Sequence, residues 1–304
     1  MEHAKVHLFG RQKLLLLYLM LSKETSSKLS LVKGIFATCN EILNKNIYDF
    51  HPYKFGPFSE TLYLDLRLLE EKGFLKKDQK YVRLNNLPSD IRQRIVAEYT
   101  PEQIYKISQL AETYSSLSFE DLLEKIYNKY PYFSIKSTQK KFITKEAKRI
   151  DKALKKTESK IFSIGYEGTS IDEFLNKLIR SNVTMLVDIR NNPVSMKFGF
   201  SGKTLRRLCE ERKIKYISIP ELGIQSDIRK PLIEANDYEK LFLDFEKNHM
   251  PTTGKYLEGL KIHLEKRERM ALLCFEACLE KCHRKIVTEH LYEYCEKIYE
   301  LEHI

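Results

Sequence analysis

The sequence predicts two domains of different fold class: a mostly helical winged helix-turn-helix domain, then a Rossmann-like α/β domain with a mostly parallel sheet. Three observations support this prediction. Residues 1–135 hold helical patterns followed by two short strand patterns, which is the order of a winged helix. From residue 160 to 304, short apolar runs alternate with helical patterns, as βαβ units do. A lysine-rich segment, residues 136–159, separates the two domains.

The composition narrows the class of partner. The chain has 304 residues and a net charge of +10, with a sequence pI near 9.1. This balance favours a polyanionic partner such as nucleic acid. No apolar run reaches the roughly 18 residues needed to span a membrane, and we interpret Leu14–Leu21 as a core helix. Six cysteines without a secretory signal favour reduced thiols, so we expect a cytoplasmic protein with no membrane partner.

Three helices and a hairpin are expected in the N-terminal domain. The helices are expected at residues 11–21, 29–43 and 60–72, and the strands at 74–75 and 81–84. Ser59 is a suitable N-cap for the third helix, and Gly73 is suited to end it. In such a fold the third helix can enter a major groove while the basic hairpin touches phosphate.

One turn in this domain carries a resemblance. Residues 52–59 read Pro-Tyr-Lys-Phe-Gly-Pro-Phe-Ser. With this turn, residues 11–84 resemble the N-terminal region of bacterial proteins associated with toxin–antitoxin and defence systems. The resemblance implies a defence context and contact with DNA or RNA, although winged helices also serve as protein-interaction modules. The side chains expected at nucleic acid, chosen for charge and exposure, are Lys54, Tyr63, Arg67, Lys76, Lys77 and Lys80.

The joint between the domains is strongly basic. Residues 136–156 hold nine Lys or Arg residues, opposed only by Glu146 and Asp151. Apolar residues recur there at three- and four-residue steps, which predicts an amphipathic helix with a lysine-rich outer face. Phosphate contact through Lys140, Lys141 and Lys148 is one interpretation, and a solvated linker helix is the other.

Four strand patterns are expected in the C-terminal domain, at residues 161–164, 184–187, 216–219 and 270–275. Between and after them, helices are expected at 171–180, at 201–213 and from 282 onward. Polar residues follow each strand: Tyr166, Glu167, Asp188, Arg190, Glu221, Cys274 and Glu276. Because ligands of open α/β sheets bind at the carboxyl ends of the strands, these side chains predict a site there. The alternative is that polar residues simply follow strands because strand ends lie near solvent.

A set of motifs in this domain carries a second resemblance. They are Ile164–Gly168, Leu186–Pro193, Phe200-Ser201, Glu221–Gly223, Leu273–Glu276 and Cys282–Arg284. In this order, over residues 160–292, they resemble the domain-of-unknown-function family numbered 488. The resemblance implies a compact Rossmann-like domain, often fused or linked to nucleic-acid-related modules. The chain departs from the family pattern at residues 277–281, which include Cys278, and in the loop after Gly223.

Carboxylates at the predicted site indicate the leading chemistry. A carboxylate can activate water or steady an oxocarbenium ion, as cleavage of an N-glycosidic bond requires. We therefore expect a DNA glycosylase, in which Asp188, Glu276 and Glu167 are catalytic. Arginines near a helix N-terminus are candidates for phosphate, and aromatic rings for base stacking. The expected substrate-binding residues are Tyr166, Arg190, Ser201, Glu221, Arg229, His283 and Arg284.

Other functions stay open on the sequence. The α/β domain could sense a nucleotide for a DNA-binding regulator, or the chain could be a metal-dependent nuclease. Cys274, Cys278, Cys282 and His283 have the spacing C-x3-C-x3-C-H, which differs from the C-x2-C pairs of common zinc sites. We therefore expect no metal and no cofactor, and interpret the cysteines as buried thiols. Cys274 as a nucleophile is a lesser alternative. DNA is expected as partner in preference to RNA, and a homodimer is left open.

Overall fold

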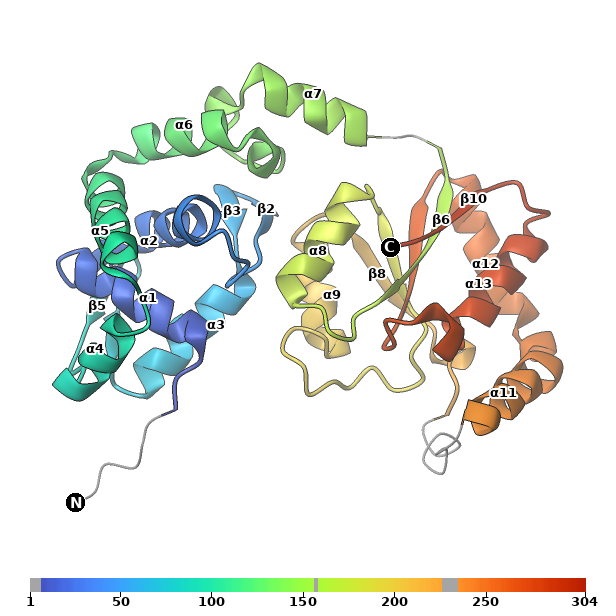
Figure 1. The fold of residues 1–304 in the computed structure, drawn as a ribbon. Coiled ribbons are helices and arrows are strands. Elements are labelled where there is room, and N and C mark those ends of the chain that lie inside the picture. The colour runs from blue at the N-terminus through green and yellow to red at the C-terminus, as the bar shows by residue number, and fades with distance from the viewer. Residues whose placement is uncertain (1–6, 156–157, 226–234) are drawn as a thin grey trace. The chain divides into compact units, whose positions relative to one another are not determined.

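The computed structural model describes residues 7–155, 158–225 and 235–304, of which residues 235–238 are described for the backbone only. The chain divides into two compact units, Met1–Asp151 (unit 1) and Lys152–Ile304 (unit 2) (Figure 1). Each unit is described by itself. Among the described residues, no helix combines the length and apolar character needed to cross a bilayer.

Unit 1 is mostly helical. Its helices are α1 (Gly10–Leu21), α2 (Lys28–Ala37), α3 (Glu60–Glu71), α4 (Ser89–Val96), α5 (Pro101–Ser116), α6 (Phe119–Lys129) and α7 (Lys145–Leu154), with shorter turns at Thr38–Leu43, Pro131–Ser134 and Lys140–Phe142. Strands β1 (Thr25–Ser27), β4 (Leu75–Lys77) and β5 (Tyr81–Leu84) form an antiparallel sheet in the order β1-β5-β4. Strands β2 (His51–Tyr53) and β3 (Gly56–Phe58) pair separately as a hairpin. The aromatic turn of the sequence is thus a hairpin that leads into α3.

Side-chain caps start the helices where the sequence predicts them. The Ser59 hydroxyl accepts a hydrogen bond from the Leu62 N–H, which starts α3. Thr100 caps α5 in the same way, and Gln103 returns a bond to the Thr100 N–H. Such caps satisfy backbone donors that the first helical turn leaves without partners.

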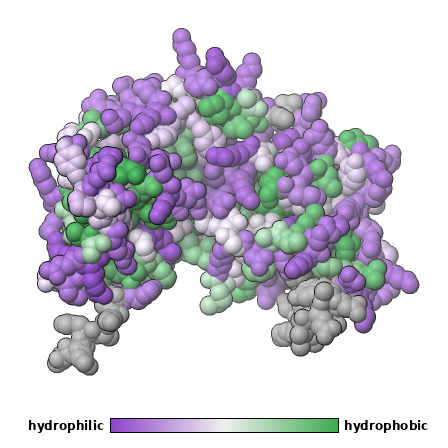
Figure 2. Space-filling model, in the orientation of Figure 1, coloured by the Kyte–Doolittle hydropathy of each residue, from purple (hydrophilic) through white to green (hydrophobic). Residues whose placement is uncertain are grey.

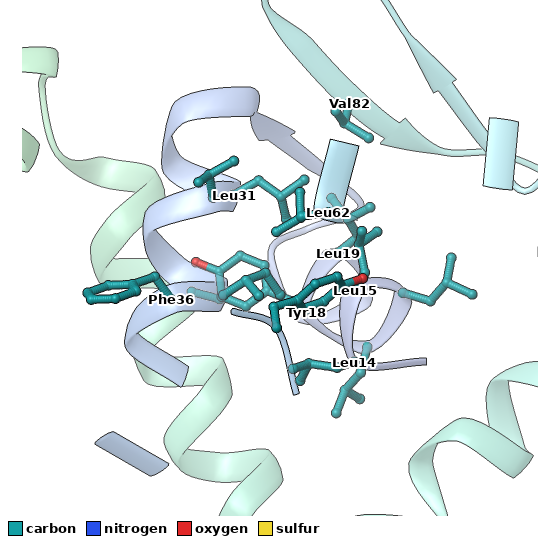
Figure 3. Packing of buried hydrophobic residues seen from close by; sticks show 14 of the residues in the cluster. Leu14, Leu15, Tyr18, Leu19, Leu31, Phe36, Leu62 and Val82 are labelled. Atoms are coloured by element: carbon teal, nitrogen blue, oxygen red, sulfur yellow. The ribbon is translucent and has the colours of Figure 1, made fainter. Parts of the chain in front are cut away.

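The core of unit 1 forms around α1. Leu14, Leu15 and Leu19 are fully buried, as expected for a helix that is apolar on every side. Figure 3 shows these side chains gathered with Leu31 of α2 and Leu62 of α3. The prediction that this apolar run is a core helix is confirmed.

Unit 2 is an α/β unit built on a parallel sheet of five described strands. These are β6 (Lys160–Gly165), β7 (Met185–Asp188), β8 (Lys215–Ser218), β9 (Arg269–Cys274) and β10 (Glu300–His303), in the order β10-β6-β9-β7-β8. The predicted α/β class is confirmed. The sequence analysis missed β10, because Glu300–His303 is an exposed edge strand with almost no apolar pattern.

Helices cover both faces of this sheet. They are α8 (Ile171–Arg180) and α9 (Gly202–Glu210) on one face, and α11 (Ala235–Asp244), α12 (Gly254–Glu265) and α13 (Arg284–Tyr294) on the other (Figure 1). Successive residues of a strand point to opposite faces, so Ile161 joins the core under α12 and α13 while Phe162 joins the core under α8 and α9.

The connections that follow β6 and β9 run over opposite faces of the sheet. These strands are neighbours, yet the chain leaves β6 through α8 over one face and leaves β9 through α13 over the other. Adjacent strands whose connections depart over opposite faces form a switch point, and ligands of open α/β sheets bind at its carboxyl edge.

Candidate active site

A pocket of about 320 Å³ lies at the carboxyl ends of β6, β7 and β9, and we call it the site pocket. This volume is at the lower end of the range for small-molecule sites, which is roughly 300–1,000 Å³. The lining residues are Tyr166, Arg190, Asn191, Asn192, Val194, Ser195, Met196, Ile224, Cys274, Phe275 and His283. The pocket therefore combines aromatic, amide, cationic and thiol groups at the edge where the topology favours a ligand.

Asp188 lies behind the pocket and is fully buried. Its carboxylate accepts hydrogen bonds from Arg190 Nε (2.8 Å), Arg190 Nη2 (2.6 Å) and the Arg190 backbone N–H (3.1 Å). A fourth bond comes from the Tyr216 hydroxyl at 2.6 Å. A carboxylate has about four acceptor positions, so these described donors nearly saturate it. The arrangement fixes the arginine and leaves little capacity for activating water.

Arg190 connects this buried carboxylate to the pocket. Its Nη1 donates to the Tyr166 hydroxyl (2.8 Å) and to the Phe200 carbonyl (2.9 Å). Burial acts to lower the pKa of Arg190, but the hydrogen bonds and charge of Asp188 outweigh it and raise that pKa above its usual value. The pocket thus presents a permanently charged guanidinium in one fixed orientation.

Aromatic rings form one side of the site pocket. The Tyr166 ring stacks on Phe200 with centroids 4.2 Å apart, and meets Phe275 edge-on at 5.2 Å. Phe275 is 42% exposed, and Val194 and Met196 are more exposed still, at 71% and 101%. The protein surface in Figure 2 is mostly hydrophilic. An exposed apolar cluster around a polar pocket therefore suits a ligand with a flat apolar face.

The loop after β7 is held by its own polar groups. Ser201, the N-cap of α9, donates its hydroxyl to the Ser195 carbonyl (2.8 Å) and accepts the Ser195 N–H (3.3 Å). Gly223 lies so close to the loop that a Cβ there would come within 2.3 Å of the Asn191 nitrogen. These contacts fix Asn191 and Asn192 at the pocket wall. Ser201 itself does not line the pocket.

Two thiols, a carboxylate and an imidazole meet beside the pocket. The Cys274 and Cys282 thiols donate to the same Glu276 oxygen, at 3.2 and 3.0 Å. Cys274 Sγ also lies 3.7 Å from His283 Nδ1. Burial, then the hydrogen bond and charge of Cys274, raise the pKa of Cys282 far above its usual value, against the opposing charge of Arg284. The Cys282 thiol is therefore protonated and is a poor nucleophile in this state.

The segment after β9 is folded back over β6 by Arg284 and Glu167. Arg284 donates to the carbonyls of Glu276 (2.5 Å) and Ala277 (3.2 Å), and its Nε donates to Ser163. The Glu167 carboxylate accepts the Ala277 N–H at 3.0 Å. A Cβ on Gly165 would lie only 1.9 Å from the Glu276 carbonyl oxygen, so this close approach requires glycine. Arg284, proposed above for phosphate, is 3% exposed and bonds the protein backbone.

The structure brings together part of the predicted site. Tyr166, Arg190 and His283 line the pocket, and Asp188 and Glu276 directly contact lining residues. Glu167, Ser201, Glu221 and Arg284 do not line it, and Arg229 lies outside the described residues. The sequence analysis did not select Asn191, Asn192, Ser195 or Phe275. The Asn191-Asn192-Pro193 run directly after β7 was the available signal.

A larger hollow of about 550 Å³ lies at the opposite edge of the sheet, lined by Lys160, Arg269 and Glu300 among others. Its charged groups are engaged with protein. Lys160 pairs with Glu300 at 2.8 Å, and Arg269 donates to backbone carbonyls of Glu158 and Ser181. We favour the smaller site pocket because it lies at the carboxyl ends of the strands.

The residues of the N-terminal part and the basic segment that were predicted to bind nucleic acid differ in exposure and in ion pairing. The exposed lysines are Lys54, Lys76, Lys80, Lys140, Lys141 and Lys148. Lys77 pairs with Glu70, and Arg67 lies 3.7 Å from Glu71. Tyr63 is half-buried and stacks on Phe58.

Comparison with known proteins gives one match. The family described as domain of unknown function DUF488 matches residues 170–291, which lie within unit 2. The resemblance predicted for the C-terminal domain is confirmed over this range. No curated protein and no solved structure matches the chain significantly.

Proposed function

We propose that the chain binds nucleic acid, DNA in preference to RNA, and hydrolyses the N-glycosidic bond of one nucleotide held in the site pocket. The observation that supports this proposal is that the site pocket lies beside the Glu276 carboxylate. A pocket with an aromatic wall and a fixed arginine lies next to the carboxylate of Glu276, which is 3.2 Å from the lining residue Cys274.

The groups in the site pocket suit a nucleotide taken out of a stack. Phe275, which is 42% exposed, offers ring surface for a base, and the buried Tyr166 ring meets Phe275 edge-on. Asn191 and Asn192 offer the donors and acceptors that read a base edge. Arg190 stays cationic at the pocket wall while its nitrogens donate to Asp188, Tyr166 and Phe200, so it favours an anionic ligand through its charge. An enzyme that acts on a base in a duplex must extrude it into a pocket of this kind.

The carboxylates take different roles in this proposal. Glu276 activates water, which adds across the glycosidic bond; the sugar carbon gains the hydroxyl and the departing base gains the proton. Asp188 is a positioning residue, because its oxygens are occupied by Arg190 and Tyr216. Glu167 holds the loop that carries Glu276.

The order of elements in unit 1 supports nucleic-acid binding. Helix, strand, two helices and a hairpin, with sheet order β1-β5-β4, support the proposal that unit 1 is a winged helix. The hairpin that would be its wing carries Lys76, Lys77 and Lys80. Helix α3, by contrast, carries Glu60, Glu70 and Glu71. We therefore propose that the wing and the basic segment around α7 contact phosphate, and that α3 does not read bases.

A second function is favoured by the state of Asp188. Glycosidic hydrolysis commonly uses two carboxylates, and the described hydrogen bonds to Asp188 leave Glu276 as the better placed one. A pocket with one carboxylate beside it also suits a sensor that binds a nucleotide without cleaving it. In that case the chain would be a DNA-binding regulator.

The test is incubation of the full chain with plain and base-modified DNA, followed by alkali and a denaturing gel. Glu276→Gln should reduce alkali-dependent breaks at least 100-fold. Glu221→Gln is the matched control, because Glu221 is exposed at the same sheet edge but off the pocket. Intact DNA with a salt-sensitive mobility shift would favour the regulator instead. Direct breaks that a chelator abolishes would favour a metal-dependent nuclease.

A further inference from the structure

We propose that Cys274, Cys282 and His283 bind one zinc-type divalent metal ion at the wall of the site pocket. Their ligand atoms all lie within 4.8 Å of one another, and all three residues are buried. Two of the three, Cys274 and His283, line the pocket. This inference concerns ion binding and does not depend on the function proposed above.

The spacing of the donor atoms suits a tetrahedral ion. Zinc lies about 2.3 Å from sulfur and about 2.0–2.1 Å from nitrogen, which separates tetrahedral ligands by roughly 3.6–3.8 Å. Cys274 Sγ and His283 Nδ1 are 3.7 Å apart. This pair already has the separation of two tetrahedral zinc ligands, and Cys282 Sγ lies within 4.8 Å of both atoms.

The histidine is held in the form that a metal needs. His283 Nε2 faces the Ile189 carbonyl oxygen at 3.4 Å. A carbonyl only accepts, so Nε2 carries the hydrogen and Nδ1 directs its lone pair toward Cys274. Histidine ligands commonly donate their second nitrogen to a carbonyl in this way. The Phe245 ring packs edge-on against His283, with centroids 5.7 Å apart, and restricts rotation of the imidazole.

The charges around the cluster balance when an ion binds. Each thiol, now hydrogen-bonded to Glu276, releases its proton to the buffer, and two thiolates neutralise a divalent cation. Arg284 Nη1 lies 3.7 Å from Cys282 Sγ and donates to it, which stabilises the thiolate. Glu276 is outside the group of three ligands. We place it beside the ion, where it accepts a hydrogen bond from the water in the fourth position.

This donor set differs from a closed structural site. Structural zinc sites use four protein ligands, whereas catalytic sites keep three and leave one position for water. One histidine and two cysteines with a nearby glutamate that is not a ligand is a set used by zinc enzymes that deaminate nucleobases. The proposed ion would supply a water of lowered pKa at the pocket wall.

Spacing in the sequence alone would group Cys278 with the three proposed ligands. Cys278 lies midway between Cys274 and Cys282 in the chain, but it is exposed and is not part of the cluster. The segment that starts after β9 turns back over Gly165 and returns Cys282 and His283 to Cys274. Cys278 is therefore a matched control in the same segment.

The experiment measures ion binding to the full chain without nucleic acid. Reduced, chelator-stripped protein is titrated with Zn²⁺ and with Co²⁺, and the bound ion is counted by elemental analysis. We expect one ion per chain and the sulfur-to-cobalt charge-transfer absorption of tetrahedral thiolate coordination. Cys274→Ser, Cys282→Ser and His283→Gln should each weaken binding by at least 100-fold, and Cys278→Ser should leave it unchanged. Glu276→Gln should weaken it by about 10- to 100-fold, as partners of the ligands do.

Three outcomes would overturn the proposal. Wild-type protein that retains less than a tenth of an equivalent is one, and equal loss of the ion in Cys278→Ser is another. The third is a Cys274–Cys282 disulfide that resists reduction, seen by mass spectrometry, which would make the pair a redox couple. Should Cys274→Ser fail to fold by circular dichroism, the Cys282→Ser and His283→Gln titrations decide the question.

Discussion

Each unit has a buried aspartate that accepts hydrogen bonds from an arginine and a tyrosine. In unit 1 the bonds join two helices, whereas in unit 2 they orient a pocket residue. In unit 1 the fully buried Asp65 of α3 accepts hydrogen bonds from Arg11 (2.6 Å), Gln12 (2.9 Å) and Tyr48 (3.0 Å). Arg11 lies 54 residues earlier in the chain, on α1. This cluster therefore fastens two helices of a core to each other.

The cluster in unit 2 is local. Asp188 holds Arg190, only two residues further on, and the arginine lines the site pocket. The same pair of side chains thus ties distant elements in unit 1 and aims one cation in unit 2. What separates the two pairs is the distance between the partners in the sequence and the place of the cation, which lies at the carboxyl ends of the strands only in unit 2.

The largest expected effect on stability is at Asp65. Asp65→Ala removes the buried carboxylate that accepts from Arg11 and from the buried Gln12 amide, which should cost about 3–5 kcal/mol in the free energy of unfolding. Because the chain has no tryptophan, urea unfolding is followed by far-ultraviolet circular dichroism. Glu112→Ala, at an exposed position of α5, is the control. If Asp65→Ala lowers the free energy of unfolding by less than about 1 kcal/mol, the Asp65 cluster does not hold α1 and α3 together.

The effect at Asp188 should be smaller on stability and larger on activity. Asp188→Asn keeps the shape but removes the charge facing Arg190, at an expected cost of about 2–3 kcal/mol. It should also abolish alkali-dependent DNA breaks, because Arg190 is no longer held. Tyr216→Phe removes one of the four hydrogen bonds, costs about 1 kcal/mol, and should keep activity. Equal activity in both variants would show that Asp188 is structural, as Asp65 is.

Among the described residues Lys33 has no ionic partner, so its burial in unit 1 can be tested by changing the pH. Its side chain is 2% exposed and donates to the Pro57 carbonyl at 2.8 Å. Burial lowers the pKa of Lys33 to about 7, below its value in the unfolded chain. The unfolded state therefore binds more protons between pH 7 and about 10, and stability rises with pH in that window.

The slope expected from Lys33 is up to about 1.4 kcal/mol per pH unit. Urea unfolding at several pH values between 7 and 9 measures it. Lys33→Met should flatten the dependence and stabilise the protein at pH 7. An unchanged slope in that variant would assign the pH dependence to other groups.

The smallest effects are expected on the surface. Lys76→Ala with Lys80→Ala should reduce the slope of log binding constant against log salt by nearly 2 on duplex DNA, since each phosphate contact contributes about 0.9. Arg67→Ala should change the slope by less than about 0.3, because Arg67 faces Glu71 on an acidic helix. Fluorescence anisotropy at several salt concentrations distinguishes the two. A larger effect at Arg67 would restore α3 as the contacting helix.

Local signals predicted much of this fold. Ser59 caps a helix where expected, and the apolar runs of β6 and β9 are strands. These features depend on a few neighbouring residues. The predicted strands also located Tyr166, Arg190 and Cys274 at the carboxyl edge of the sheet, because each follows or ends a predicted strand.

What the sequence did not predict depends on contacts between distant residues. β10 is a strand because it pairs with β6, and its own residues are polar. Asp188 carries the expected charge, but its saturation by Tyr216 appears only when β7 and β8 pair. The grouping of Cys274 with His283 requires the chain to fold back across Gly165. These contacts join residues that are far apart in the chain, so the spacing of residues in the sequence does not predict them.

The position of β6 in the sheet has a consequence for synthesis of the chain. β6 is made first in unit 2, yet its neighbours β9 and β10 follow it much later, with Lys160 and Glu300 separated by 140 residues. At about 5–20 residues per second, roughly 7 to 28 s pass on the ribosome between these two residues. Until β9 is made, this buried, apolar strand has both edges open, and one edge stays open until β10 follows. Unit 2 is therefore expected to depend on chaperones while it is being translated, whereas the local contacts of unit 1 can form as it emerges.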